Sequence, residues 1–226
     1  MKRTIEIRAA EGGDDSKLFV KDLAQAYRKF AERKGWIARL IDEYQGELHI
    51  EVQGTDLSGL DNECGGHRIQ RVPPTERKGR VHTSTVTVAV IDSSEQTSSG
   101  VLIPYSDLKI EWYSGTGAGG QHRNKHQNSC RITHIPTGLV ATAQCRSRQN
   151  SYEQAMQDIQ TRVDSLAFSQ YNTSISSTRR EQVGSGMRGD KIRTYRFQDD
   201  TVQDHITGKR AKCNAVLKGN FDLLWN

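Results

Sequence analysis

The sequence lacks the features that mark membrane-spanning, secreted and disulfide-linked proteins. No apolar run approaches the roughly 20 residues of a membrane span, and the opening residues, MKRTIEIRAAEGGDD, lack the apolar core of a signal peptide. The four cysteines are widely spaced and form no C-x-x-C pair, which favours reduced, structural thiols. With 34% hydrophobic residues in a chain of 226, the composition predicts a cytosolic globular protein of one large or two small domains.

Acidic residues are also missing from one long stretch. From Trp112 to Tyr152 the sequence has no Asp or Glu, although the first 63 residues carry 13 acidic residues against 10 basic ones. A carboxylate near a phosphate backbone would repel it, whereas an ordinary solvated basic face usually keeps some acids interspersed. The stretch therefore indicates a nucleic-acid partner. Its basic residues are the candidate RNA-binding residues: Arg123, Lys125, Arg131, Arg146 and Arg148.

The same stretch contains a glycine-rich loop, Ser114–Gln121 (SGTGAGGQ), directly after a predicted strand at 108–112. Glycine lacks a Cβ, so such a loop can press backbone N–H groups onto a reacting centre, although the same composition also suits a flexible surface turn. The glycine spacing fits G-x-G-x-x-G, but the polar sequence QHRNKHQNSC follows where a dinucleotide site needs an apolar helix. The Lys and Ser or Thr of a phosphate-binding P-loop are absent as well.

A zinc site is disfavoured by the residues that follow the loop. His122 and His126 have the spacing of a helical zinc pair, but Arg123 stands where the catalytic Glu should be, and no helical pattern surrounds them. We therefore expect no metal.

Hydrophobic periodicity predicts an α+β fold with two domains. A first domain of residues 1–103 is completed by a returning segment, 178–226, and a second domain, 104–177, is inserted between them. In the first domain we expect strands at 4–8, 36–41, 47–52, 68–72, 81–91 and 191–197 and a helix at 16–34, capped by the turn at Gly12–Asp15. In the second we expect strands at 108–112, 131–135 and 139–144 and a helix at 152–171. Polar connectors are expected at 92–100 and 172–180.

Several segments resemble the class I peptide chain release factors, which read a stop codon on the ribosome and trigger hydrolysis of peptidyl-tRNA. In chain order they are IEIRAAEGGDD, GGHRIQRVPPTERKGRVHTS, SGTGAGGQ, RITHIPTGL and STRREQVGSGMRGDKIRTYRF. The resemblance implies that residues 1–103 with 178–226 form a codon-recognition domain and that 104–177 form a small α/β hydrolysis domain. It also implies ribosomal RNA, the mRNA stop codon and peptidyl-tRNA as partners, a monomer, and no metal or nucleotide cofactor.

The implied chemistry centres on the tripeptide Gly119-Gly120-Gln121. Release requires attack of water on an ester, and a pre-aimed N–H donor accelerates this step because negative charge develops on the carbonyl oxygen. By resemblance, the backbone N–H of Gln121 supplies the donor, and Gly119 and Gly120 permit the backbone geometry. The Gln121 side chain would exclude bulkier nucleophiles and help to place the water. This glutamine is often N5-methylated in the family, so a glutamine methyltransferase is a further expected partner.

The resemblance also assigns a codon-reading role to the hairpin. A Pro-x-Thr tripeptide marks family members that accept UAA and UAG, and here it is Pro73-Pro74-Thr75. A hydroxyl or an amide both donates and accepts hydrogen bonds, so it can serve both adenine and guanine. The structural alternative is a plain polar hairpin beside a helix cap. By resemblance the bases are met as follows: the first by the backbone of Gly12 and the carboxylate of Asp15, the second by Thr75, the third by Gln70 and Thr83, with His82 stacked between the second and third.

Departures from the family pattern leave two alternative functions. Asp15 replaces a usual Glu, Arg123 a usual Val and Ile206 a usual Arg, and the family's N-terminal helical domain is absent from the sequence. The alternatives are a rescue hydrolase that acts on stalled ribosomes whatever the codon, and a non-catalytic decoy that occupies the decoding site. The complete reading hairpin and the absence of a long basic C-terminal tail argue against the first, and the intact Gly-Gly-Gln argues against the second.

Overall fold

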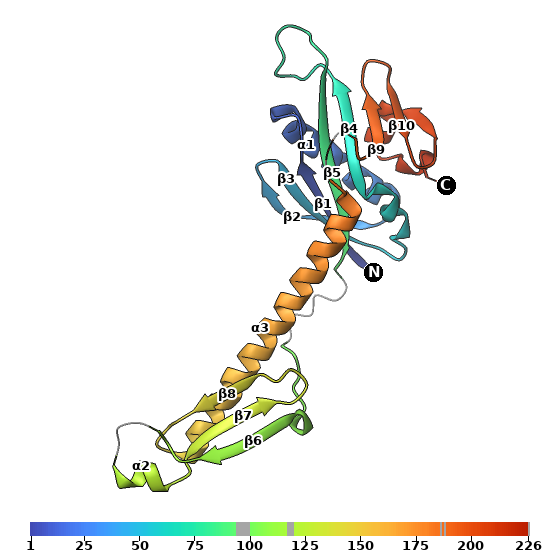
Figure 1. The fold of residues 1–226 in the computed structure, drawn as a ribbon. Helices are drawn as coiled ribbons and strands as arrows, with labels where there is room; N and C mark the ends of the chain where they lie inside the picture. Colours follow the sequence, from blue (N-terminus) through green and yellow to red (C-terminus); the bar gives the residue numbers. More distant parts are fainter. Residues whose placement is uncertain (94–99, 117–119, 186, 188, 226) are drawn as a thin grey trace. The chain divides into compact units, whose positions relative to one another are not determined.

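The computed structural model describes residues 1–93, 100–116, 120–185, 187 and 189–225, with backbone alone for residues 122 and 123. The chain divides into two compact units, residues 1–96 with 175–226 and residues 97–174 (Figure 1). Each unit combines a sheet with helical segments, which confirms the α+β fold class. Most of the connector expected at 92–100 lies outside the described residues.

The first unit is built on an eight-stranded sheet with the order β11-β10-β9-β4-β5-β1-β3-β2. Neighbouring strands are antiparallel except β4 and β9, which are parallel. Every strand predicted for this unit is present, and two short ones, β10 and β11, were not predicted. The strands are β1 (Lys2–Ala9), β2 (Ile37–Tyr44), β3 (Glu47–Gln53), β4 (Gly65–Arg71), β5 (His82–Asp92), β9 (Lys191–Arg196), β10 (Thr201–Asp204) and β11 (Arg210–Lys212).

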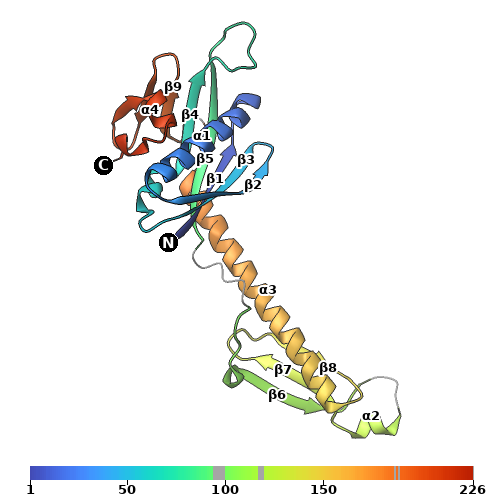
Figure 2. The same cartoon turned by 180° about the vertical axis from the view of Figure 1, so that it is seen from behind.

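Helix α1 (Asp14–Arg33) lies across one face of this sheet (Figure 2). Its buried apolar residues recur every three or four positions, which is the spacing that gives a helix one apolar face. The core continues into the C-terminal segment, where α4 (Cys213–Leu217) is followed by a 3₁₀ turn at Phe221–Leu223. The Phe221 ring stacks on Tyr27, with ring centroids 4.7 Å apart, so the returning segment packs against α1.

The turn at Gly12–Asp15 caps this helix as predicted, although the helix itself starts earlier than expected. Helix α1 begins at Asp14, two residues earlier than expected, and its N-cap, Gly13, makes no side-chain capping hydrogen bond. The Asp15 carboxylate is drawn away from the helix end because it binds Arg71 and Ser84 on the neighbouring hairpin.

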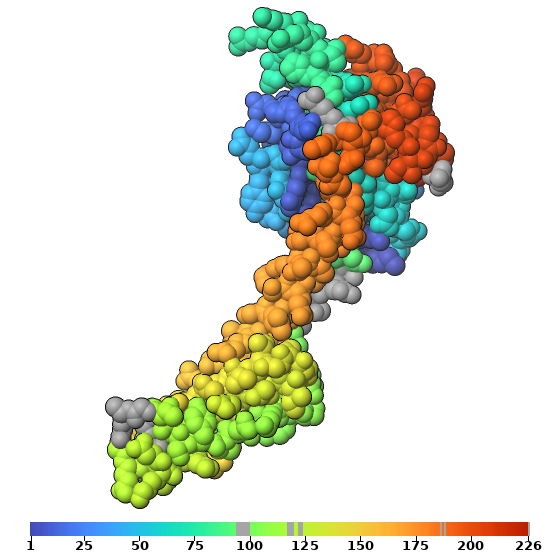
Figure 3. Space-filling model, viewed as in Figure 1, coloured from blue at the N-terminus to red at the C-terminus, as the bar shows by residue number. Residues whose placement is uncertain are grey.

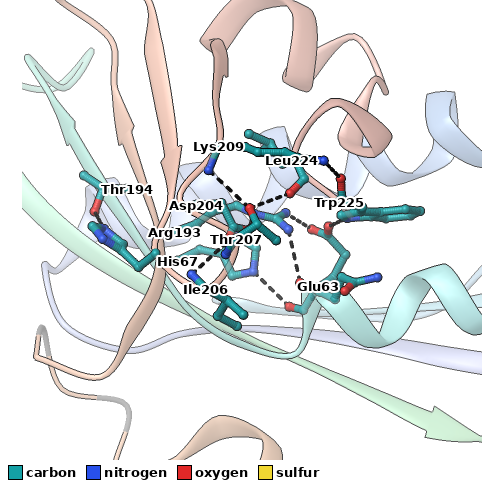
Figure 4. Close-up of polar contacts among 12 residues, drawn as sticks. Glu63, His67, Arg193, Thr194, Asp204, Ile206, Thr207, Lys209, Leu224 and Trp225 are labelled. Atoms are coloured by element: carbon teal, nitrogen blue, oxygen red, sulfur yellow. Dashed lines mark hydrogen bonds and ion pairs between the residues drawn. The ribbon is translucent and has the colours of Figure 1, made fainter.

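A buried ion-pair cluster joins the returning segment to the start of β4 (Figure 4). Arg193 on β9 is fully buried, and its guanidinium bonds to Glu63 and, at 2.9 Å from Nε, to Asp204. The Glu63 carboxylate also accepts hydrogen bonds from the Tyr27 hydroxyl and the Trp225 indole, at 2.9 and 2.7 Å. Each buried charge therefore has a partner, which is the condition for tolerating charge in a core.

The second unit holds a three-stranded antiparallel sheet and most of a long helix. The strands are β6 (Leu108–Tyr113), β7 (Ser129–His134) and β8 (Val140–Ala143), in that order across the sheet. Helix α3 (Arg148–Val183) packs Ala155, Ile159 and Val163 against this sheet to form a separate small core. A short helix, α2 (Gln121–Lys125), follows the glycine loop, where the sequence pattern had given no helix.

The connector predicted at 172–180 is also wrong, because α3 runs through it to Val183. The run of Ser and Thr had indicated a loop, since these hydroxyls often compete with helical hydrogen bonds. Here two hydroxyls bond back to carbonyls of the preceding turn, Thr173 to Ser169 at 2.8 Å and Ser174 to Tyr171 at 2.7 Å. Beyond them, Arg179 binds the buried Glu6, so contacts with the large sheet stabilise the end of the helix.

We expect Arg193→Met to lower the free energy of unfolding by about 3 to 5 kcal/mol, because Glu63 and Asp204 would lose their shared cation while staying buried. Urea unfolding followed by tryptophan fluorescence would measure the loss. Arg28→Met, at an exposed site on α1, is the matched control and should change stability by no more than about 0.5 kcal/mol. A loss below about 1 kcal/mol for Arg193→Met would contradict the importance of the cluster.

The free energy of unfolding should also decrease as the pH is lowered, because of His67. This side chain is fully buried, and its pKa is lowered to about 4, chiefly by burial and further by the Arg193 charge. An unfolded histidine titrates near 6.5, so between about pH 6.5 and 4 the unfolded chain holds a proton that the folded chain does not. The free energy of unfolding should therefore decrease by about 2 kcal/mol from pH 7 to pH 5 through this group. Urea titrations of His67→Gln should lack that part of the decrease; an unchanged slope would refute the assignment.

Candidate nucleic-acid interface

The residues predicted to read the third base lie together on the β4–β5 hairpin. In the register of this antiparallel pair Gln70 lies opposite Thr83, and Arg71 lies opposite His82. The Arg71 guanidinium lies over the Phe19 ring of α1, 5.7 Å from its centroid, so Arg71 faces the helix. Because side chains alternate between the faces of a strand, Gln70 and Thr83 share the face away from α1. His82 follows Arg71 to the helix side, so the hairpin separates it from the Gln70–Thr83 pair.

The tip of this hairpin presents the Pro-x-Thr tripeptide. Pro73 is buried, whereas Pro74 and Thr75 are exposed, and the tip stands out from the surface of its unit (Figure 3). The Glu76 N–H donates to the Pro73 carbonyl at 3.0 Å, which closes a turn around Thr75. The exposed hydroxyl is thus held on a short, proline-stiffened turn.

Glu76 organises the rest of the tip, a role that the sequence analysis missed. Its carboxylate is only 6% exposed and accepts hydrogen bonds from the backbone of Lys78, from the His82 ring and from the Arg80 guanidinium, the first two at 2.7 Å. These bonds hold the pKa of Glu76 below its ordinary value, the backbone bond from Lys78 having the largest effect. The carboxylate therefore fixes the ring of His82 before any base is present.

The start of α1 is tied to the same hairpin. Gly12 has φ of 120°, and a Cβ there would lie 2.7 Å from the Ser84 Cα, so only glycine fits this close approach. The Asp15 carboxylate is 3% exposed and is bound by Arg71 Nε at 2.7 Å and Ser84 Oγ at 3.1 Å. Arg71 also reaches Asp22, at 2.8 Å. Gly12 and Asp15 thus lie beside β5, and Asp15 already has two protein partners.

The glycine loop is described at 114–116 and at Gly120 and Gln121, whereas Gly119 lies outside the described residues. Gly120 and Gln121 are exposed, and a Cβ added at Gly120 would meet no atom of the described residues within 4 Å. Gln121 begins α2, and the first N–H groups of a helix have no intrahelical acceptor. On the other side of the loop, the Gln144 amide bonds to the backbone N–H and the hydroxyl of Thr116, at 3.2 and 3.3 Å, so β8 anchors the start of the loop.

The predicted RNA-binding residues of the second unit are exposed where they are described. Lys125, Arg131, Arg146 and Arg148 are all exposed, and the side chain of Arg123 lies outside the described residues. Arg131 lies over the Tyr113 ring and Arg148 over the Trp112 ring, the latter 4.1 Å from its centroid. Stacking of this kind orders a guanidinium and leaves its donors available to a phosphate.

In the described part of the chain, no three His, Cys, Asp or Glu side chains gather as a metal site. Among the same residues, no helix combines the length and the apolar character needed to cross a bilayer.

Supporting residues of these sites were harder to find from sequence than the motif residues. Arg71 and Glu76 flank the tripeptide but carry no signal of their own, because their partners are distant or depend on the shape of the turn. Gln144 is separated from Thr116 by two strands. Arg196 on β9 donates to the Gln70 amide oxygen at 3.3 Å, a contact that only the parallel pairing of β4 and β9 creates.

Comparisons with known proteins identify two domains in this chain. Residues 1–88 match the PCRF domain, and residues 95–206 match the RF-1 domain. Peptide chain release factor 1 of Acetivibrio thermocellus is 42% identical over 228 residues, covering 96% of this chain and 62% of that protein. Peptide chain release factor 1 of Lactobacillus johnsonii is also 42% identical, and the match covers 98% of this chain and 63% of that protein. The chain thus spans somewhat less than two thirds of these relatives.

A solved structure gives the same result for the fold. RF2 of Thermus thermophilus has a TM-score of 0.55 and 28% sequence identity, and the match covers 99% of this chain and 66% of that one. The two domain matches, the similarity to named relatives and the shared fold all extend over nearly the entire chain. The chain belongs to the family of peptide chain release factors, with their PCRF and RF-1 domains.

Proposed function

We propose that this protein terminates translation by stop-codon-dependent hydrolysis of the peptidyl-tRNA ester on the ribosome, and that it accepts UAA and UAG. The observation that carries the proposal is the hairpin itself. An exposed Thr75 stands at its tip, Gln70 and Thr83 lie opposite each other on one face, and His82 lies on the other. A plain polar hairpin would not need these groups on separate faces, so their separation favours codon reading over a purely structural role.

The proposed reading of the codon follows from these positions. Thr75 hydrogen-bonds the second base, and His82 stacks on it while the third base passes to the Gln70–Thr83 face. A hydroxyl and an amide can each donate and accept, so this pair suits adenine and guanine alike at the third position. The restriction to UAA and UAG is assigned to the tripeptide Pro73-Pro74-Thr75, because it resembles the tripeptide of family members that accept these two codons.

The first uridine is proposed to meet the start of α1. Gly12 offers backbone groups there, and Asp15 offers a carboxylate that is already held by Arg71 and Ser84. A carboxylate oxygen has more than one lone pair, so Asp15 can accept one more hydrogen bond without losing these partners. Its fixed position makes the first-base site rigid, which favours discrimination by geometry.

Hydrolysis is proposed to use the loop of the second unit. The backbone N–H of Gln121 stabilises the oxyanion that develops as water attacks the ester, and Gly119 and Gly120 let the substrate approach the backbone. The Gln121 side chain places the water and excludes larger nucleophiles. The side chain of Gln121 is exposed, which suits its N5-methylation by a methyltransferase. Ribosomal RNA and the tRNA, bound by the exposed basic residues, complete the site.

A decisive test is release of labelled formyl-methionine from ribosomes that carry initiator tRNA, with UAA, UAG, UGA, a sense codon or an empty A site presented in parallel. We expect release on UAA and UAG alone. Thr75→Val, which removes the hydroxyl and keeps the shape of the side chain, should slow release on both codons by about 5- to 150-fold, since one base-specific hydrogen bond is worth about 1 to 3 kcal/mol. The free energy of unfolding should stay within about 0.5 kcal/mol of wild type.

Other outcomes of this test point to the alternatives. Release on sense codons or on an empty A site would identify a rescue hydrolase. Binding without release on every template would identify a decoy.

Gly120→Ala should abolish most of the release activity without affecting stability. A methyl group at this position meets no atom of the described residues and requires no unusual φ, so the fold should tolerate it to within about 0.5 kcal/mol. Release should fall by about 10² to 10³-fold, because the methyl group keeps the ester away from the Gln121 N–H. Gln121→Ala keeps that N–H and should lose less. Equal and small losses for both variants would contradict the proposed donor.

A further inference from the structure

The face of the hairpin that carries Gln70 and Thr83 continues across three more strands, β9, β10 and β11, as a basic surface. Strand register aligns two rows of side chains on this face, because paired residues of neighbouring strands point to the same side. One row is Thr83, Gln70, Arg196, Thr201 and Lys212, and the other is Thr85, Arg68, Thr194, Gln203 and Arg210. Neither row contains an acidic residue.

Two arginines of these rows adjoin the proposed third-base pair. Arg196 lies beside Gln70 and Arg68 lies one row away, so their charges are near neighbours. The pKa of Arg68 is held below its ordinary value, by partial burial first and by the charge of Arg196 second. Burial lowers the pKa of His205 most, and the charges of Lys191, Arg68 and Arg196 lower it further.

These arginines have no acidic partner within the described residues. Neither Arg68 nor Arg196 makes an ion pair there, and the buried Nε of Arg68 makes no hydrogen bond. The acids closest in sequence to Arg196, Asp199 and Asp200, lie in the β9–β10 turn, where Asp200 accepts the backbone N–H of Asn214 instead. The acid closest in sequence to Arg68 is Glu63, which pairs with Arg193. By contrast, Arg193 on the opposite face of β9 has two carboxylates. Two neighbouring cations without a counter-charge are costly to hold together unless an anion binds them.

We propose that Arg68 and Arg196 form a binding site for a phosphodiester of RNA directly beside the third-base pair. This inference rests on the proposed function and adds a contact to it. Guanidinium groups suit phosphate because their N–H donors form a fork that matches two phosphate oxygens. The Arg196 Nε–H donates a hydrogen bond to the Gln70 amide oxygen, at 3.3 Å, and the two terminal nitrogens of the guanidinium are left to bind the phosphate.

The position of Arg196 couples the phosphate to base reading. By holding the Gln70 oxygen, Arg196 turns the amide NH₂ group away from β9, toward the side where Thr83 lies. A phosphate that fixes Arg196 therefore also fixes the amide that contacts the third base. The phosphate comes either from the mRNA nucleotide that follows the codon or from ribosomal RNA, and the length of the mRNA distinguishes these two sources.

The test measures the dissociation constant of the protein from stop-codon ribosome complexes over a series of salt concentrations. Arg68→Gln and Arg196→Gln should each weaken binding about tenfold and reduce the slope of log K against log salt by about one. Arg68→Lys keeps the charge and should lose less. Arg210→Gln removes the same charge from the same face, two strands beyond Arg196, and should stay close to wild type.

Two mRNAs, one ending at the third nucleotide of UAA and one extended by six nucleotides, identify the phosphate. If it belongs to the mRNA, wild type binds the extended template about tenfold more tightly, and Arg68→Gln binds both alike. If it belongs to ribosomal RNA, wild type binds both templates alike, and Arg68→Gln is weakened on both. If both Gln variants match Arg210→Gln in affinity and slope, the proposed site is wrong.

A ribosome-free arm separates this proposal from the proposed function. Binding of a single-stranded RNA dodecamer is measured for the same variants, each first checked by urea unfolding. Should wild type fail to act on any stop codon, a reduced salt slope for Arg68→Gln and Arg196→Gln on the dodecamer would still support the phosphate site. An unchanged slope there, with the fold intact, would overturn it.

Discussion

The first unit depends on the burial of one guanidinium, that of Arg193, between Glu63 and Asp204. Glu63 precedes β4, whereas Arg193 and Asp204 belong to the returning segment, so the pair of Arg193 with Glu63 joins parts of the chain 130 residues apart. A buried cation without its partners is strongly destabilising, so β9 is held to one position against β4. That position sets the parallel register in which Arg196 meets Gln70. The composition of the surface that we propose to meet the third base therefore follows from an interaction on the other side of the sheet.

Alternation along β4 gives this strand two separate tasks. Ile69 and Arg71 face α1 and belong to the core, whereas Arg68 and Gln70 face outward. A register slip of one residue would exchange the two sets, burying an amide and exposing Ile69. The bond between Asp15 and Arg71 opposes such a slip because it links the strand to the start of α1, and the bond from Ser84 to Asp15 links β5 to the same point. The register of β4 therefore decides both which polar groups face outward and which residues stay buried.

The sequence predicted most elements of the fold because their patterns are periodic and long. The α+β class, helix α1 and the strands from β1 to β9 follow from apolar alternation and from helical spacing, with ends displaced by a few residues. Strands β10 and β11 have four and three residues, too few to show a period. The expected break at 172–180 was wrong because Ser and Thr have low helix propensity, whereas contacts of Arg179 and Gln182 with β1 and β5 decide the local structure. Motif residues were predicted from resemblance, but Glu76, Gln144 and Arg196 act through contacts that exist only after folding.

Gly12 and Gly120 show why a motif glycine needs a structure to be understood. At Gly12 the backbone has φ of 120° and lies against Ser84, so a side chain is excluded by the protein itself. At Gly120 no atom of the described residues opposes a side chain. If the proposed roles hold, loss of function after substitution at Gly12 would therefore mix misfolding with misreading, whereas substitution at Gly120 would isolate the approach of the substrate. Within the described residues, the fold accounts for the first of these two glycines, and only a bound partner accounts for the second.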